Sequence, residues 1–382
     1  MREPRWVADK LKVFLGELFA FGMLLVFLRV ESIWGTVLFI FGIASVWYLF
    51  NKLEQLRMPV ISVFQREKSF SMILAALFLL SLPLFLRDTP YLIHLCLLSG
   101  IYVMLATGLN YQLGSTNIVN FATAAAYGVG AYTYALLAVH TGLNFWILIF
   151  AAGGASALMG LILGMPTLKT KDYYLSLVTV AFGLIVYLLL NNFMWTGGPN
   201  GISDIPAPSI FGYSFKEELK MFGIGMPYQA NFYYLVLFFS VVYIIIAKRL
   251  HDSRTGLTWN AIREDEIAAK CSGIDTANYK ILSFCINCFH DGVTGAVYAA
   301  YVSYISPENF QFMVSVVVVT MVILGGMDNI LGVAIGAVLL TLLPEKFRMF
   351  EDYRLLVYGI IVISTLIFRP QGLFPQKLRR YS

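Results

Sequence analysis

The sequence contains little charge. Only 13% of its 382 residues are Asp, Glu, Lys or Arg, whereas about a quarter of a soluble domain is charged. Hydrophobic residues make up 59%, and the mean hydropathy is +0.74. This composition excludes an ordinary soluble domain and predicts an all-α polytopic membrane protein, a helical bundle of about 10–12 transmembrane helices. The net charge of +5 does not indicate nucleic acid, because Lys and Arg are confined to stretches between apolar runs.

Cysteine is also scarce, with four in the chain. Three of them lie in or beside apolar runs, which excludes a disulfide framework. Cys285 and Cys288 are one helical turn apart, but haem attachment requires His directly after the second Cys, and Phe289 stands there. A zinc site would need further ligands that the sequence does not supply. We therefore expect no metal and no other cofactor in this chain.

The chain lacks the sequence G-x-x-x-x-G-K-[ST], so it cannot cradle the phosphates of ATP in the usual way. It also lacks paired carboxylates or clustered His at workable spacing, which makes a membrane-embedded enzyme the weakest hypothesis. Energy for any work must come from another polypeptide or from an ion gradient.

No small-x-small cleavage site follows the first apolar run, and the basic residues before it are spread over twelve positions. We therefore predict a retained first span rather than a signal peptide. Including the first, the chain contains twelve candidate spans of about 15 to 23 residues, against roughly 20 needed to cross a bilayer. Their predicted limits are 13–29, 33–50, 70–86, 91–112, 117–138, 145–166, 174–195, 231–247, 280–302, 313–326, 330–344 and 355–368; the short pairs could be re-entrant.

The distribution of positive charge predicts the orientation. If the N-terminus is cytoplasmic, the inside segments hold 20 of the 27 Lys and Arg residues. Because cytoplasmic loops carry an excess of Lys and Arg, this bias predicts cytoplasmic N- and C-termini. It also places residues 248–280, which we call the polar segment, in the cytoplasm.

The polar segment is the one long charged, helix-forming stretch between apolar runs. Residues 257–270 predict a short helix along the membrane face, with Glu266 and Lys270 as a favourable i, i+4 pair. Gly273 supplies a C-terminal stop, and Asp275 or Thr276 can cap the next helix. We expect the charged run 263–266 to face a partner and the small side chains of Ala261, Ala268 and Ala269 to fit a cleft.

The longest predicted outside loop, residues 196–230, begins with a run of turn-forming residues, Gly-Gly-Pro-Asn-Gly. Its stretch SFKEELKMF predicts a short surface helix. A loop of about 35 residues is long for a plain connector, so a surface for an external partner is nearly as plausible.

Small residues four apart occur inside several predicted spans. They let helix backbones approach closely where no hydrophobic effect drives association. Ordinary helix packing is the preferred interpretation, and pore lining is the minority one. The pairs are Gly160 with Gly164, Gly332 with Gly336, and Ala124 with Gly128.

The polar segment resembles a known motif. The run Ala261-Ile-Arg-Glu-Asp-Glu-Ile-Ala-Ala269, between Gly256 and Gly273, is similar to the cytoplasmic coupling motif of ABC importer permeases for branched-chain amino acids, of the LivM type. Further matches follow in order: GLNYQLG at 108–114, GVGAYTYALL at 128–137, DYYLSLVTVAFG at 172–183, TGGPNGIS at 196–203, SYISPENF at 303–310, ILGGMDNILGVAIGA at 323–337 and FRPQGLF at 368–374.

The resemblance implies a division of the chain. Residues 91–374 would form the permease core, with the coupling loop 248–280 inside it. Residues 1–90 would be an N-terminal extension with about three transmembrane helices, and residues 375–382 a cytoplasmic tail. The protein would then lie in a bacterial plasma (inner) membrane.

The resemblance also implies partners: a second homologous permease, two cytoplasmic ATPase subunits that hold ATP and Mg, and an extracytoplasmic substrate-binding protein. Ten residues would couple to the ATPase: Gly256, Ala261, Ile262, Arg263, Glu264, Asp265, Glu266, Ala268, Ala269 and Gly273. Five would contact the binding protein: Gly197, Gly198, Pro199, Asn200 and Gly201. The substrate would be a branched-chain (Leu, Ile, Val) or related hydrophobic amino acid, imported by alternating access.

The chain departs from this family at two places. Asn120 and Thr123 replace residues that could face the substrate path. In the ninth predicted span, His290 and Asp291 occupy a stretch that is normally small and apolar. An ionisable residue inside a membrane suggests function, so Asp291 is a further candidate for the path, with a structural hydrogen bond as the other interpretation.

Two alternatives remain. A related ABC permease could move urea or short amides, which would suit Asn120 and Thr123. An ion-coupled secondary transporter could use Asp291 as its proton site and would need no ATPase.

Overall fold

The computed structural model describes residues 5–30, 66–167, 172–210, 212–221 and 224–346, together with scattered positions between 32 and 64 and between 356 and 374. The chain divides into two compact units, residues 1–93 with 345–352, and residues 94–344 with 353–382. The predicted spans 33–50 and 355–368, the motif at 368–374 and the tail 375–382 lie wholly or mostly outside the described residues. The predicted boundary at residue 90 stays a prediction.

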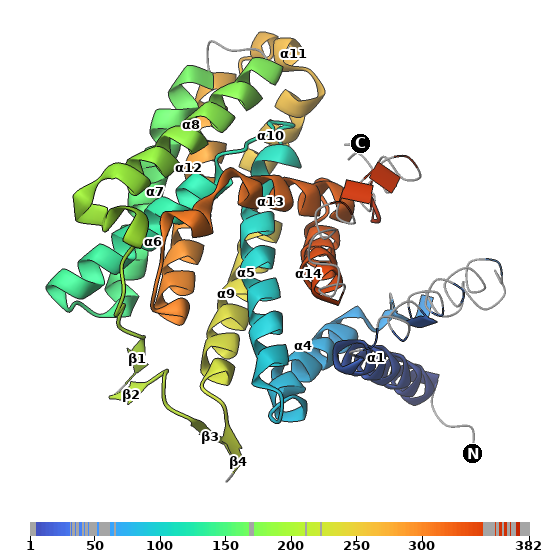
Figure 1. Cartoon of the computed structure of the whole chain (residues 1–382). Coiled ribbons are helices and arrows are strands. Elements are labelled where there is room, and N and C mark those ends of the chain that lie inside the picture. Colours follow the sequence, from blue (N-terminus) through green and yellow to red (C-terminus); the bar gives the residue numbers. More distant parts are fainter. Residues whose placement is uncertain are drawn as a thin grey trace. The chain divides into compact units, whose positions relative to one another are not determined.

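The described part of the chain is almost entirely helical (Figure 1), which confirms the predicted all-α membrane fold. Its long helices are α1 (Arg5–Arg29), α4 (Lys68–Phe85), α5 (Pro90–Leu113), α6 (Thr123–Thr141), α7 (Phe145–Thr167), α8 (Asp172–Asn192), α9 (Gln229–His251), α12 (Thr276–Val302), α13 (Phe312–Gly325) and α14 (Ile330–Lys346). Seven stretches of these described helices are long and apolar enough to cross a membrane. The seven are 9–29, 68–85, 90–113, 145–166, 174–192, 229–251 and 307–325.

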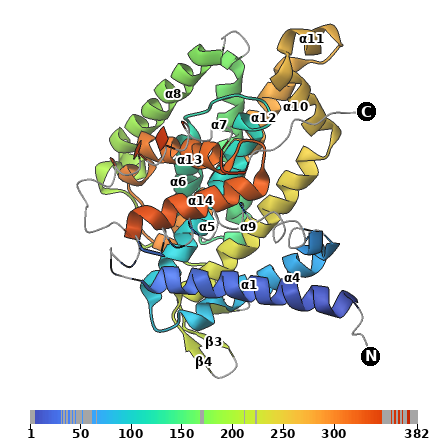
Figure 2. The same cartoon turned by 90° about the vertical axis from the view of Figure 1, so that its right-hand side faces the viewer.

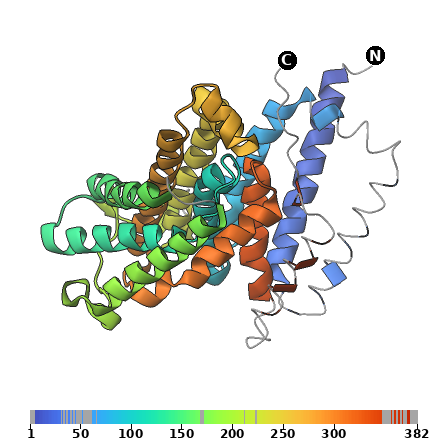
Figure 3. The ribbon, with the colours of Figure 1, turned by 90° about the horizontal axis from the view of Figure 1, so that it is seen from above.

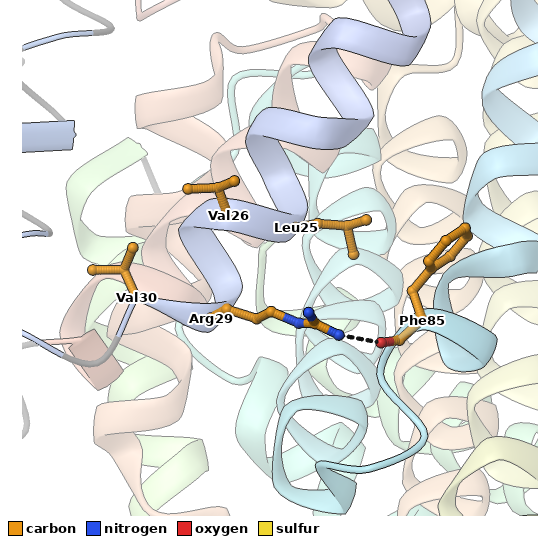
Figure 4. A pocket seen from close by; sticks show the side chains of 5 residues that line it. All are labelled: Leu25, Val26, Arg29, Val30 and Phe85. Atoms are coloured by element: carbon orange, nitrogen blue, oxygen red, sulfur yellow. Dashed lines mark hydrogen bonds between the residues drawn. The ribbon is translucent and has the colours of Figure 1, made fainter.

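In the first unit, α1 and α4 pack through aromatic rings and one partly buried polar contact. Phe21 stacks on Phe78 with ring centroids 4.9 Å apart, and the Ser71 hydroxyl donates to Glu17 at 2.6 Å. At the end of α1, the Arg29 guanidinium donates to the carbonyl of Phe85 at 2.8 Å, beside an apolar cavity of about 290 Å³ (Figure 4). Two polar groups of α1, Glu17 and Arg29, thus serve the packing of this helix pair.

The second unit is built around α12, which packs most extensively on α6 and α7. Glycines permit these contacts. A Cβ on Gly130 would lie 2.3 Å from the Cα of Gly292, and one on Gly160 would lie 2.9 Å from the Cβ of Cys288. Side chains cannot fit where backbones approach this closely, so the small-residue spacing predicted from the sequence is a helix-packing device here.

Helices α13 and α14 form a short, tightly packed pair. A Cβ on Gly336 would lie 2.7 Å from the carbonyl of Met321, and one on Gly332 would lie 2.4 Å from that of Gly325. The 14 residues of α13 rise only about 21 Å, less than the roughly 30 Å hydrocarbon core of a bilayer. Only together with the 3₁₀ turn at Pro307–Phe310 does this region reach a spanning length.

The loop after α8 contains two small hairpins instead of the expected surface helix. Their strands are β1 (Ser209–Ile210) with β2 (Tyr213–Ser214), and β3 (Leu219–Met221) with β4 (Ile224–Met226). The Asn231 side chain, at the start of α9, donates to the carbonyls of Phe215 and Glu217 at 3.1 and 2.8 Å. These backbone acceptors are therefore bound to α9 and are not paired within a helix, so the helix prediction was wrong.

The two ends of the second unit are distinct. The polar segment forms α10 (Arg254–Glu264) and α11 (Glu266–Cys271) at one end, and the four strands lie at the other (Figures 1 and 2). Figure 3 shows the unit from the end that carries the polar segment. Gly114 at the end of α5 and Asp328 between α13 and α14 meet the polar segment at this end.

Candidate functional site

The polar segment contains two helices where the sequence predicted one. Asp265 is extended, with φ −156° and ψ 107°, and its carboxylate accepts hydrogen bonds from the backbone N–H groups of Ile267 and Ala268 at 2.8 and 3.0 Å. Asp is a strong N-cap, so it ends α10 and begins α11. The expected cap of α12 is confirmed, because the Asp275 carboxylate accepts from the N–H of Asn278.

Trp259 anchors α10 to the bundle. Its ring is almost fully buried and packs with Tyr111 of α5 and Ala247 of α9. The indole N–H donates to the carbonyl of Tyr279 in α12 at 2.9 Å. One side chain therefore joins the polar segment to three helices. The sequence does not mark Trp259 as important, because a Trp in a helical run is typical of an ordinary core residue.

Arg263 is bound within its own chain. Its guanidinium donates to the carbonyl of Gly114 at 2.6 Å and lies 3.8 Å from the Asp328 carboxylate. Its contact with an ATPase partner stays a prediction, because the side chain is held here by two contacts within the chain. A carbonyl at a helix C-terminus carries partial negative charge, which makes the end of α5 a favourable site for an arginine.

Asp328 is the acceptor at the centre of this contact, and its place inside the ILGGMDNILG match gives no sign of this role. The Ser115 hydroxyl donates to its carboxylate at 3.0 Å, and the Nε2 atom of His251 lies 3.4 Å away. The backbone N–H of Asp328 donates to the Asn110 side chain at 2.9 Å. Burial raises the pKa of Asp328, and the Ser115 hydroxyl and Arg263 charge only partly oppose this effect.

Glu266 is held by two lysines. Its carboxylate lies 3.0 Å from Lys270, as the i, i+4 spacing predicts, and 2.5 Å from Lys280 of α12. Burial acts to raise the pKa of Glu266, but the two lysines outweigh it and hold the pKa below its ordinary value. Like Arg263, this residue serves contacts within the chain.

The outward surface of α11 and its flanks mixes apolar and charged side chains. Ile267 is 75% exposed, and Ala268, Glu264 and Asp265 are exposed beside it. Gly273, with φ +84°, closes α11 and is also exposed. Among the other predicted coupling residues, Ala261 is half-buried, and the buried ones are Gly256, Ile262 and Ala269.

The predicted path residues are buried in the interior of the second unit. The Asn120 amide donates to the Gln112 side-chain oxygen at 2.7 Å, and the same oxygen accepts from Asn287 of α12 at 3.0 Å. Asn120 also accepts from the N–H of Ala122, which orients the residues just before α6. Asn120, Gln112 and Asn287 thus form a buried polar cluster. It could not be predicted from the sequence, because Asn287 is far from the other two residues along the chain.

Asp291 lies one turn beyond Asn287 on α12 and is fully buried. Neither of its carboxylate oxygens, nor the Thr123 hydroxyl, has a hydrogen-bond partner among the described residues. A Cβ on Gly108 of α5 would lie 3.1 Å from the Asn287 side-chain oxygen and 3.5 Å from Asp291 Oδ1. The absence of a side chain at Gly108 therefore leaves room for the polar face of α12 against α5.

The turn at residues 196–203, which we call the glycine turn, lies at the end of the second unit opposite the polar segment. Gly197, Gly198 and Gly201 all have positive φ, and a Cβ on Gly201 would lie 2.0 Å from the carbonyl of Ile305. Ile202 and Ile305 exchange backbone hydrogen bonds of 2.9 and 3.0 Å. Pro199 and Asn200 are exposed at its tip, and the Tyr304 hydroxyl donates to the Asn200 carbonyl.

A bundle of apolar helices with a buried polar interior and an anchored polar segment defines a multi-pass membrane protein of the transporter class. Residues 91–366 match the family described as branched-chain amino acid transport system / permease component. No solved protein structure matches the chain.

The curated relatives of the chain are also permeases of branched-chain amino acid transport systems. The chain is 37% identical over 317 residues to the high-affinity branched-chain amino acid transport system permease protein LivM of Salmonella typhimurium, covering 78% of this chain and 75% of that protein. It is 26% identical to a probable LivM of Methanocaldococcus jannaschii, over 73% of this chain and 91% of that protein. It is 23% identical to the permease protein LivH of Escherichia coli, over 72% and 92%.

The chain therefore belongs to the family of permease components of branched-chain amino acid transport systems, and its resemblance to the LivM type is confirmed. It is a transport permease and not itself an enzyme.

Proposed function

We propose that this protein is the permease subunit of an ATP-driven ABC importer that moves branched-chain amino acids, or closely related hydrophobic amino acids, into the cytoplasm. The match of residues 91–366 to the permease family carries this proposal. The buried polar cluster is compatible with an amino-acid substrate, because a neutral or zwitterionic solute needs hydrogen-bonding groups along its path rather than many charged side chains.

The proposed partners are a second permease, two cytoplasmic ATPase subunits and an extracytoplasmic binding protein. Similarity to both LivM and LivH of Escherichia coli supports a pair of related permeases, since one organism holds both. ATP and Mg would bind the ATPases, because this chain has no P-loop sequence. The exposed tip of α11, with Ile267 and Ala268, would enter a cleft on an ATPase subunit.

We place the protein in a bacterial inner membrane with both termini in the cytoplasm, in line with the excess of Lys and Arg in the segments assigned to that side. The polar segment would then face the ATPases, and the glycine turn the binding protein. Alternating access would follow: closure of the ATPases moves α10 and α11, and the path between the two permeases opens to the other side.

Reconstitution tests the proposal. The chain, its companion permease, ATPases and binding protein are placed in liposomes, and uptake of labelled leucine and labelled urea is measured with and without ATP. We expect leucine uptake that requires ATP and all companions and that survives collapse of ion gradients. Preferred urea uptake would reassign the substrate. Uptake by the chain alone, driven by an ion gradient, would show a secondary transporter instead.

A further inference from the structure

Asp328 joins segments that lie far apart in the sequence. It lies in the short connection between α13 and α14, yet its contacts reach the ends of α5, α9 and α10. The carboxylate meets Ser115 at 3.0 Å, His251 at 3.4 Å and Arg263 at 3.8 Å. The polar segment and the α13–α14 pair are thus joined through one buried acidic side chain.

The α13–α14 pair is stiff enough to pass on a displacement. Its helices touch backbone to backbone at Gly325, Gly332 and Gly336, where a Cβ would approach the opposite helix to within 3 Å. Close-packed contacts of this kind are not continuously deformable, so the pair is expected to move as one body. A shift of Asp328 therefore becomes a shift of α13.

The other end of α13 reaches the polar interior. The Ser315 hydroxyl accepts a hydrogen bond from the backbone N–H of Ala124 at 2.9 Å, in the first turn of α6. Phe312 packs against Phe121 with ring centroids 5.8 Å apart. Phe121 lies between Asn120 and Thr123, two residues assigned to the path. A continuous chain of contacts thus runs from Arg263 through Asp328 and α13 to the start of α6.

Burial raises the pKa of Asp328 above its ordinary 3.8, despite the Ser115 and Arg263 contacts. A group whose folded pKa is raised adds stability only when protonated, and that contribution is lost as the pH rises through the folded pKa. The Ser115 and Arg263 contacts thus hold a charge at a place where burial disfavours it.

We propose, on the basis of the proposed function, that Asp328 is a positioning residue that transmits movement of the polar segment through α13 to the substrate path. Residue 328 takes φ +68°, which Asn tolerates almost as well as Asp. Asp328→Asn therefore keeps the shape, the backbone and the Ser115 contact while removing the charge that attracts Arg263.

The test uses the complete transporter in liposomes, with ATP hydrolysis and leucine uptake measured on the same vesicles. We expect Asp328→Asn to assemble with the ATPases, to keep its thermal stability and at least half of its ATP hydrolysis, and to lose tenfold or more of the leucine moved per ATP. Asp328→Glu keeps the charge and should therefore move more leucine per ATP than Asp328→Asn. The matched control is Asp252→Asn, whose exposed carboxylate contacts the same His251 at 3.3 Å and should couple normally.

Arg263→Gln adds a second arm. If Asp328 acts through Arg263, the double variant should move as much leucine per ATP as the more affected single variant. Both substitutions remove the same Arg263–Asp328 interaction, so their effects should not add. Normal leucine moved per ATP in Asp328→Asn would overturn the inference, and loss of ATPase assembly would show a docking role instead. A wild-type complex without ATP-driven uptake would overturn the proposed function itself, and the inference with it.

Discussion

The two ends of the second unit are held in different ways. At the polar segment, side chains make the contacts: Arg263 with Gly114, Trp259 with Tyr279, and Glu266 with Lys280. At the glycine turn, backbone meets backbone, and Gly201 leaves no space for a side chain. A side chain can change its hydrogen-bond partner when its helix moves. Two backbone segments in direct contact cannot do this, so they either move together or lose the contact. The first end suits a moving part and the second a fixed one.

The largest effect is expected at the fixed end. Gly201→Ala places a Cβ 2.0 Å from the Ile305 carbonyl at φ +68°, so the backbone must shift, and we expect a loss of about 4 kcal/mol or more, or no folded protein. Gly142→Ala is the control, because φ is +62° but no atom lies within 4 Å, and its strain costs only about 1–2 kcal/mol. Melting temperatures in detergent measure both. Equal losses would remove the distinction between the ends.

A smaller loss is expected at the mobile end. Trp259→Phe keeps an aromatic ring but removes the donor to the Tyr279 carbonyl, which costs about 1–2 kcal/mol. ATP hydrolysis by the assembled complex should become less dependent on substrate, since α10 is less firmly tied to α12. Tyr304→Phe, which also removes one hydrogen bond to a carbonyl but at the glycine turn, is the comparison. The contrast fails if both variants change ATP hydrolysis equally.

The interior between the ends gives a third prediction. Asp291→Asn removes a carboxylate that has no partner among the described residues, and we expect stability to stay equal or to rise by up to about 1 kcal/mol. Asn287→Ala, by contrast, loses the bond to Gln112 and should lower stability. Thermal unfolding of both variants in the same detergent provides the measurement. A clear loss in Asp291→Asn would show that its carboxylate has a stabilising partner.

The smallest effect concerns pH. The lysines hold the pKa of Glu266 below its ordinary 4.5, so its contribution to stability is present above that value and is lost as the pH falls through the lowered pKa. The group is partly exposed, so we expect at most about 1 kcal/mol. The melting-temperature gap between wild type and Glu266→Gln should stay constant from pH 7 to near 4.5 and close below it. A gap that closes near pH 6 would assign the effect to another group.

The sequence predicted the fold class and the family because both rest on long-range regularities. Apolar runs of spanning length and the ordered matches from GLNYQLG onward are visible without any tertiary contact. Ten of the predicted spans correspond to described helices, although α6 begins at Thr123 rather than at residue 117.

The sequence did not predict how the polar segment is attached, because that depends on residues distant in the chain. Arg263 meets Gly114 at a separation of 149 residues, and Asp328 meets Ser115 at 213. Nor could the pattern of helix formers show that Asp265 would accept two backbone N–H groups and divide the helix. The assignments of the coupling, path and binding-protein residues stay predictions.

The backbone exchange between Ile202 and Ile305 has a consequence for engineering. It holds the long loop at its root, and Asn231 of α9 holds the loop again at Phe215 and Glu217, so the tip of the first hairpin between β1 and β2 can lengthen without breaking either attachment. A short peptide epitope inserted at Gly212, where no atom lies within 4 Å of a Cβ position, should be tolerated. Antibody labelling of intact cells would then reveal which side of the membrane this hairpin occupies.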